Sequence, residues 1–161
     1  MTDKKQHTEI KPILSSLFNW ASRLAMLAWV LLVIHPFWHG ATLAVSIIIT
    51  LLCALYVYLV FLGKRHDLAG ASSGGSFSSL HGVMKLFKNP RGTLAGWVHY
   101  LAFDLFVGLF IVLDAQQQNI SHWYLMPILL ATLMLGPSGL LIYVLLRFLI
   151  VGNYLAFDFA L

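Results

Sequence analysis

The sequence predicts an all-α, polytopic membrane protein with four transmembrane helices in a single domain. Of its 161 residues, 60% are hydrophobic and only 10% are charged, a balance that soluble globular domains do not show. Four apolar segments are each long enough to cross a hydrocarbon core of about 30 Å. They cover residues 17–37, 41–62, 94–113 and 123–151.

The first two segments form an adjacent pair joined by a short connection. A basic start precedes the first segment, as in a secretory signal, but no small-residue cleavage site separates it from the run that begins at Ala41. We therefore expect the first segment to be retained as a signal-anchor helix. Its alanines at 21, 25 and 28 predict a strip of small residues for close helix packing.

The linker between the second and third segments, residues 63–93, divides into two parts. Residues 70–79 are rich in glycine and serine, the composition of a flexible linker. An amphipathic helix is then predicted, with Ser79 as its N-terminal cap and Asn89-Pro90 as its stop. Its apolar positions follow helical spacing: Leu80, Val83, Met84 and Phe87. Such a helix suits the cytoplasmic membrane surface, either as an anchor or as a lid beside a lipid-facing entrance.

The fourth segment is interrupted by the sequence Gly-Pro-Ser-Gly at 136–139. Proline removes a backbone hydrogen bond, and two glycines permit a kink or an unwound turn. Breaks of this kind are tolerated in membranes where other groups satisfy the freed backbone, and they often line binding sites. The sequence leaves open whether this one is a site or a plain structural kink.

Basic residues lie before the first segment and in the linker, and the connections 35–40 and 114–122 contain none. The flanking basic residues are Lys4, Lys5, Lys11, Lys64, Arg65, Lys85, Lys88 and Arg91. By the positive-inside rule, both termini and the linker face the cytoplasm. We expect a bacterial inner membrane, or a plastid membrane if the source is a plant or alga.

Several other classes of function are disfavoured. The basic residues flank apolar stretches instead of forming a stripe of their own, which argues against nucleic-acid binding. Cys53 has no partner within the chain, and the histidines show no metal-binding spacing, so we expect no metal site. The glycine-rich stretch lacks a phosphate-binding pattern, and no cofactor is predicted.

Asp104 is the leading candidate for a functional residue because it lies near the middle of the third apolar segment. An ionisable group at that depth is costly and is by default a functional-site hypothesis. Trp97, Tyr100 and Gly108 share its helix face by three-and-four spacing, and Gly108 permits close backbone approach. Arg23 in the first segment could lie at a similar depth. Asp104 is then either ion-paired with Arg23 or unpaired, protonated and able to donate a proton.

His99 lies five residues before Asp104, and thus about 140° around the helix. A direct contact between them is not expected. One ligand could reach both groups only if it were long or if a neighbouring helix completed the site. Arg147, near the end of the fourth segment, is expected to extend to the cytoplasmic interface.

The residues that follow the linker resemble a known family. The pattern Thr-Leu-Ala-x-Trp-x-His, continued by Asp-Leu-Phe, occupies 93–106, and it is flanked by SSLHGVMKLF, HWYLMP and LGPSGLLIYVLLR. Together these stretches are similar to the abscisic-acid-deficient-four-like membrane proteins. That family is implicated in the formation of neoxanthin from violaxanthin, an opening of an epoxide to an allenic alcohol without net redox change. The resemblance implies a membrane-embedded carotenoid isomerase.

Epoxide opening requires an acid for the developing alkoxide and a base for the proton that leaves carbon. Under this resemblance Asp104 is the acid and His99 the base, while Arg23 tunes Asp104. Trp97, Tyr100 and Phe103 would pack along a polyene. The alternative is a non-catalytic protein that binds a carotenoid or another lipid, or that assists membrane assembly. A proton-coupled transporter is a third reading, favoured by the intramembrane carboxylate and the broken helix.

Overall fold

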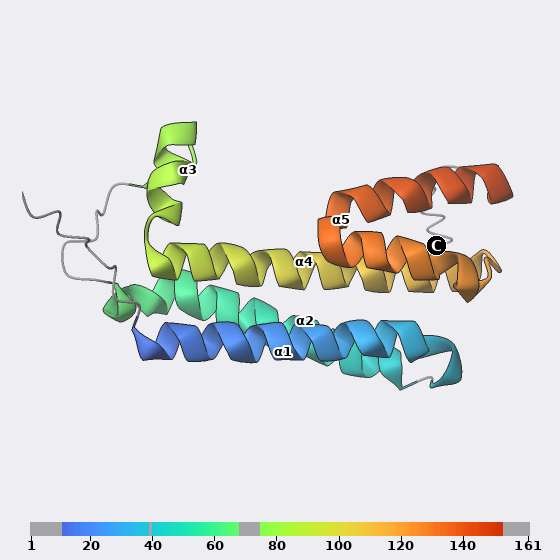
Figure 1. Cartoon of the computed structure of the whole chain (residues 1–161), viewed down its shortest axis with the longest axis horizontal. Helices are drawn as coiled ribbons and strands as arrows, with labels where there is room; N and C mark the ends of the chain where they lie inside the picture. Colours follow the sequence, from blue (N-terminus) through green and yellow to red (C-terminus); the bar gives the residue numbers. More distant parts are fainter. Residues whose placement is uncertain (1–10, 39, 68–74, 153–161) are drawn as a thin grey trace, which may run out of the picture.

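The computed structural model describes residues 11–38, 40–67 and 75–152, which form an all-helical protein (Figure 1). Its α-helices are α1 (Pro12–Ile34), α2 (Ala41–Val57), α3 (Leu80–Phe87), α4 (Pro90–Gln117) and α5 (His122–Val151). A 3-10 turn follows α1 at His35–Phe37, and a π turn and a 3-10 turn extend α2 at Tyr58–Leu62 and Gly63–His66. By total length and composition, four helical segments could cross a membrane, which confirms the predicted fold class of an all-helical, polytopic membrane protein. Lys4, Lys5 and linker residues 70–74 lie outside the described residues.

Helix α4 is the centre of the bundle, and α1, α2 and α5 all pack against it. The alanine strip of α1 is fully buried, with exposed fractions of 0–1% at positions 21, 25 and 28. A Cβ at Gly108 of α4 would lie 2.9 Å from Trp29 and 3.0 Å from Leu32. Small side chains therefore let α1 and α4 approach closely, as the sequence predicts.

The helix α5 reverses direction at Leu135, whose φ of −149° and ψ of 63° are not helical. Gly136 lies beside Asp104 at the middle of α4, whereas Arg147 pairs with Asp114 near the end of α4. A Cβ at Gly139 would lie 2.0 Å from the Thr132 hydroxyl. In a straight helix, two residues seven positions apart are separated by about 10 Å. The fourth segment is therefore a helical hairpin, as Figure 1 also shows.

Neither half of this hairpin is long enough to cross a bilayer. Residues 122–134 and 136–151 correspond to helices of about 20 and 24 Å, whereas the hydrocarbon core is about 30 Å thick. The fourth segment, which matches a membrane span in overall length and composition, thus folds back as a hairpin whose tip reaches the middle of α4. The start of α1 and the end of α5 lie at opposite ends of the bundle (Figure 1). The prediction that both termini face the cytoplasm concerns residues outside the described part of the chain and stays a prediction.

A buried polar cluster fastens the second half of the hairpin to α4. The Arg147 Nε atom lies 2.7 Å from Oδ2 of Asp114, and the two side chains are only 3% and 14% exposed. The hydroxyl of Tyr143, itself fully buried, donates a hydrogen bond to the same oxygen. The prediction that Arg147 extends to the cytoplasmic interface is therefore wrong. The reversal of α5 carries this arginine to the opposite end of the bundle, where it meets a carboxylate.

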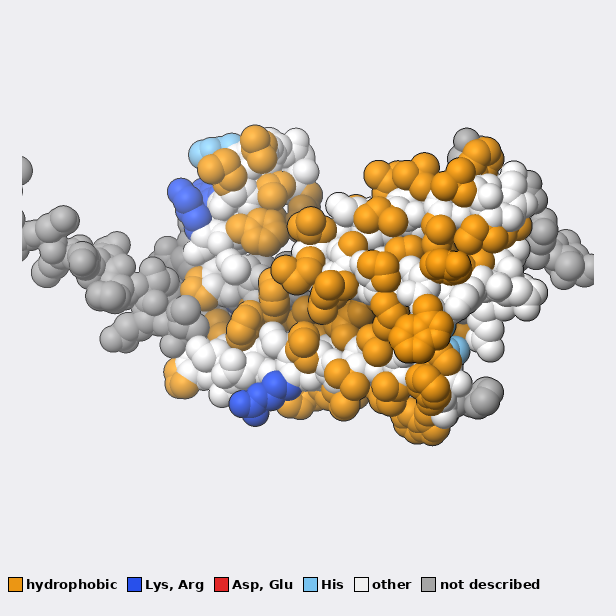
Figure 2. All heavy atoms as spheres, turned by 45° about the vertical axis from the view of Figure 1, so that its right-hand side comes forward, with side chains coloured by type: hydrophobic (Ala, Val, Ile, Leu, Met, Phe, Trp, Pro, Cys, Tyr) orange, Lys and Arg blue, Asp and Glu red, His pale blue; other side chains and the backbone are white. Residues whose placement is uncertain are grey.

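The surface helix α3 forms where the sequence predicts it. Ser79 caps it by accepting a hydrogen bond from the Gly82 amide at 3.1 Å. Leu80 and Met84 are 78% and 56% exposed. The helix lies across the bundle axis beside the start of α4 (Figure 1), and Figure 2 shows basic and apolar side chains on its surface. Asn89 caps α4, which therefore begins at Pro90, four residues earlier than expected.

An ion pair joins the end of the α2 extension to the start of α4. Arg91 binds both carboxylate oxygens of Asp67, through Nε at 2.6 Å and a terminal nitrogen at 3.0 Å. The same guanidinium donates to the Leu59 carbonyl at 2.6 Å, within the π turn. The Arg91 guanidinium holds the pKa of Asp67 below its ordinary value of 3.8. These bonds fix the register between α2 and α4 on the side of the bundle that carries α3.

The hairpin makes a prediction about topology. In a Cys53→Ser background, single cysteines at Ser78, Gln117 and Val151 can be tested in intact cells with a membrane-impermeant maleimide. We expect the cysteines at 117 and 151 to react from the same side, and the cysteine at 78 from the other. A straight α5 would instead make the cysteine at 151 behave like the one at 78.

Candidate functional site

Asp104 lies at the tip of the hairpin, at mid-length of α4. Its side chain is only 7% exposed, and its Oδ2 atom is buried without a hydrogen-bond partner among the described residues. The Gly136 backbone N–H donates toward the carboxyl group. Gly136 begins the second half of α5, and a helix N-terminus stabilises an adjacent anion or acceptor. Asp104 therefore caps a half-helix and still has one oxygen available.

Gly136 is required by the closeness of this approach. A Cβ at position 136 would lie 2.0 Å from Oδ1 of Asp104 and 2.7 Å from its carboxyl carbon. Real Cβ atoms do not come this close to another heavy atom, so any side chain at 136 would force either the Asp104 carboxyl or the tip of the hairpin to move. The absence of a side chain at Gly136 thus allows the Asp104 carboxyl to contact the backbone, and this contact fixes the position of the hairpin tip on α4.

Tyr100, one helical turn before Asp104, satisfies backbone groups that the break leaves unpaired. Pro137 has no N–H, so the Leu133 carbonyl lacks its usual helical donor. The Tyr100 hydroxyl lies 3.2 Å from that carbonyl oxygen and 3.1 Å from the carbonyl oxygen of Met134. It also lies close to the Asp104 carboxyl. Two polar side chains of α4 thus stabilise a turn that lipid alone could not.

An aromatic row leads from the tip toward the end of the bundle that carries α3. The ring centroids of Tyr100 and Trp97 are 5.5 Å apart, and those of Trp97 and Phe18 are 5.6 Å apart. The Trp97 indole N–H donates to the Ser22 hydroxyl at 3.1 Å, which fixes the ring between α1 and α4. We call Phe18, Trp97 and Tyr100 the aromatic row.

The aromatic row borders an open groove of about 640 Å³ between the first halves of α1 and α4. Its lining residues are Leu14, Ser15, Phe18, Asn19, Lys88, Pro90, Thr93, Leu94 and Trp97. Apolar atoms dominate the lining. We call this feature the α1/α4 groove. A cavity of this size, apolar with a few polar groups, is suited to a long apolar ligand.

His99 points elsewhere. It is exposed and stacks on Phe103, with ring centroids 4.5 Å apart, and it lies 5.4 Å from the ring of Tyr56 on α2. His99 and Phe103 therefore belong to the α2 side of α4, whereas Asp104 faces the hairpin. The structure does not bring His99 and Asp104 to one place, in agreement with their angular separation in the sequence.

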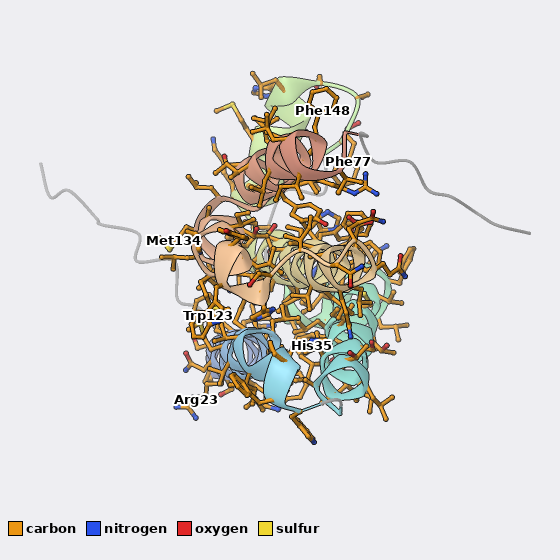
Figure 3. All side chains as sticks on the ribbon, turned by 90° about the vertical axis from the view of Figure 1, so that its right-hand side faces the viewer. Arg23, His35, Phe77, Trp123, Met134 and Phe148 are labelled. Atoms are coloured by element: carbon orange, nitrogen blue, oxygen red, sulfur yellow. The ribbon has the colours of Figure 1, made fainter. Side chains whose placement is uncertain are left out.

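Arg23 also lies apart from Asp104. It is exposed on α1 and points away from the bundle (Figure 3). Neither ion pair of the described residues involves it. The alternative in which Arg23 pairs with Asp104 is therefore not realised. Gly108, predicted to contact substrate, instead receives Trp29 and Leu32 of α1.

Comparison with protein families shows the family of the chain. The family model described as ABA DEFICIENT 4-like matches residues 16–143, most of the sequence. The chain belongs to this family. Comparison with curated proteins and with solved structures found no match. The matched region of the ABA DEFICIENT 4-like family contains the aromatic row, Asp104 and the hairpin tip, and it extends to Tyr143. The resemblance in the motif around Asp104 is thus confirmed and extends over α1 and α2.

Two parts of the site in this ABA DEFICIENT 4-like protein were missed by sequence reasoning. The first is the contact between Gly136 and Asp104. A glycine in the break of one apolar segment and a carboxylate in the middle of the preceding segment could have indicated it. The second is the cluster of Asp114, Tyr143 and Arg147. Asp114 follows the last residue of the predicted third segment, so its position suggested a loop residue and not a buried partner.

The geometry of the tip predicts a specific coupling between two positions. Gly136→Ala should destabilise the protein by about 1–3 kcal/mol, because the new methyl group overlaps the Asp104 carboxyl. Asp104→Ala should relieve that overlap, so the double variant should lose less stability than the sum of the two single variants. Ser138→Ala, at an exposed position of the same turn, is the matched control. Unfolding in mild detergent measures each value, and strictly additive losses would contradict the contact.

Proposed function

We propose that this ABA DEFICIENT 4-like protein binds a long, flat, apolar ligand of the carotenoid kind in the α1/α4 groove and isomerises it through Asp104. The observation that carries the proposal is the order of three features along α4: the α1/α4 groove, the aromatic row that extends from it to Tyr100, and the carboxyl of Asp104 one turn further on, whose buried Oδ2 atom has no hydrogen-bond partner among the described residues. The ligand would enter and leave laterally, from the lipid bilayer, because the groove is open at the surface of the bundle.

The dimensions and chemistry of the path support an extended ligand. Thr93 in the groove and Asp104 are eleven residues apart on α4, or about 16 Å. Between them the ligand meets the faces and edges of Trp97 and Tyr100. Aromatic rings at centroid spacings near 5.5 Å stack well on flat conjugated chains. A rigid polyene also loses little conformational entropy on binding.

Asp104 can supply the proton that an epoxide opening needs. As the C–O bond of the epoxide breaks, the carboxyl proton goes to the oxygen and forms an alcohol. The carboxylate then accepts the proton released from the neighbouring carbon as the new double bond forms. Protons balance, no electrons are gained or lost, and the carboxyl group is regenerated. His99 is not needed, which matches its place on the other side of α4. A dry site favours such a transfer because no water competes for the proton.

Non-catalytic binding of the same ligand is the second candidate, and one observation favours it. Asp104 already caps the second half of α5 through Gly136, so its burial has a structural reason that requires no reaction. A carotenoid or lipid carrier would use the same groove and the same aromatic row. The two candidates differ only in whether the free oxygen of Asp104 reacts.

The distribution of basic residues supports one orientation in the membrane. Lys11, Lys64 and Arg65 all lie at the end of the bundle that carries α3, as do the basic residues of α3 and of the start of α4. We propose that this end faces the cytoplasm of a bacterium and that the end of α5 faces the opposite side. The α1/α4 groove then opens near the cytoplasmic leaflet.

Expression in a carotenoid-producing bacterium tests the proposal. We expect pigment to co-purify with the intact chain and to include an isomer absent from the host. Asp104→Asn should retain bound pigment and abolish the isomer, because an amide cannot donate the same proton. Trp97→Ala should reduce bound pigment several-fold, whereas Trp123→Ala, at an exposed position at the other end of the bundle, should not.

Three results would decide between the candidates. Pigment bound equally by the intact chain and Asp104→Asn, without any isomer, would favour the carrier. Loss of pigment only in Trp97→Ala would support the groove in either case. A folded protein that carries no pigment would contradict a carotenoid ligand.

A further inference from the structure

The polar side chains that line the α1/α4 groove include one positive charge, that of Lys88, which no acidic residue of the described lining neutralises. Lys88, Ser15 and Asn19 are among its lining residues, and Lys88 lies at its outer end, just before α4 begins. None of these three side chains has a hydrogen bond or ion pair with another described residue. Among the described residues, no acidic side chain lines the groove. The groove therefore presents a cation, a hydroxyl and an amide donor with nothing in the described chain to meet them.

The acidic residues of the described chain are engaged or distant. Asp67 is bound on both oxygens by Arg91, and Asp114 pairs with Arg147 at the other end of the bundle. Asp104 lies about 16 Å deeper along α4 than Thr93. A ligand group that pairs with Lys88 must therefore bring its own negative charge.

We infer that the ligand of the α1/α4 groove is an amphiphile with an anionic end, a carboxylate or a phosphate, held by Lys88. Ser15 and Asn19 donate hydrogen bonds to the same group. The apolar chain of the ligand runs inward past Phe18 and Trp97 toward Asp104. This inference rests on the proposed use of the groove, and it narrows the ligand from a long apolar chain of the carotenoid kind to such a chain that ends in an acidic group.

The position of α3 supports a ligand that comes from the leaflet and not from water. Lys88 follows the last residue of α3, which lies across the bundle with its apolar residues exposed, as surface helices do at the level of lipid headgroups. An amphiphile in that leaflet already holds its anionic group at this level and its chain at the level of Trp97. Lateral entry then requires no change of depth. Cationic side chains at this level attract anionic lipid groups.

Fluorescence of Trp97 provides a direct test. Bromine atoms quench tryptophan on contact, so 9,10-dibromostearate at pH 8.5 serves as the anionic probe and its methyl ester as the uncharged probe. Titrations use the full chain in mild detergent. Subtraction of the Trp97→Phe signal isolates Trp97 from the other four tryptophans. The variants are Lys88→Gln and, as the matched control, Lys85→Gln, a lysine of the adjoining helix α3 that does not line the groove.

We expect the acid to quench Trp97 at lower concentration than the ester. Lys88→Gln should weaken the acid about five-fold, the effect of one lysine facing an anion at the membrane surface, and leave the ester unchanged. Lys85→Gln should change neither. Inorganic phosphate alone should not displace the acid, because it cannot occupy the apolar part of the groove.

Two results would overturn the inference. Equal quenching by acid and ester, unaffected by Lys88→Gln, would show a groove without selection for charge and would leave the proposed apolar ligand standing. Quenching by neither probe would contradict both the anionic end and the use of the groove. Equal losses in the Lys88 and Lys85 variants would show a general surface charge effect and would likewise overturn the role of Lys88.

Discussion

The structure depends on one constraint: backbone groups freed by a helix break inside a membrane must find partners within the protein. The break in α5 frees the carbonyls near Leu133 because Pro137 offers no N–H. Tyr100 and Asp104 of α4 provide the partners, on either side of the turn. Once they hold the tip, the second half of α5 returns along α4, and Arg147 reaches Asp114. The hairpin, the buried ion pair and the position of the site are consequences of the same few contacts.

The same constraint explains why the candidate chemistry lies where it does. A carboxyl group is tolerated at mid-membrane because it caps a half-helix, and capping uses only one of its oxygens. The other oxygen is buried without a hydrogen-bond partner among the described residues, one helical turn beyond Tyr100 of the aromatic row. Asp104 thus has both a structural role, as the cap of the half-helix, and the proposed catalytic role. A substitution that removes its side chain would disturb both roles, so Asp104→Asn, which keeps the shape of the side chain, is the informative variant.

Much of this arrangement could be predicted from the sequence. The apolar segments, the capped helix α3 and the break at 136–139 follow from local signals, and Trp97, Tyr100 and Asp104 share a face by helical spacing. The direction of α5 after the break could not be predicted, because Gly-Pro-Ser-Gly permits either a kink or a reversal. Tertiary partners decide between them. For the same reason Arg23 appeared to be the natural partner for an intramembrane carboxylate, whereas the reversal gives that role to Arg147, opposite Asp114 and not Asp104.

The most direct test of this account is the distance between the two ends of α5. Spin labels on cysteines at Ser121 and Val151, in a Cys53→Ser background and a lipid bilayer, report that distance by pulsed electron paramagnetic resonance. The hairpin predicts a separation well below 30 Å, because both positions lie near the same end of the bundle. A continuous helix over these thirty residues would separate them by about 45 Å. A distance near that value would contradict the hairpin, and with it the site built at its tip.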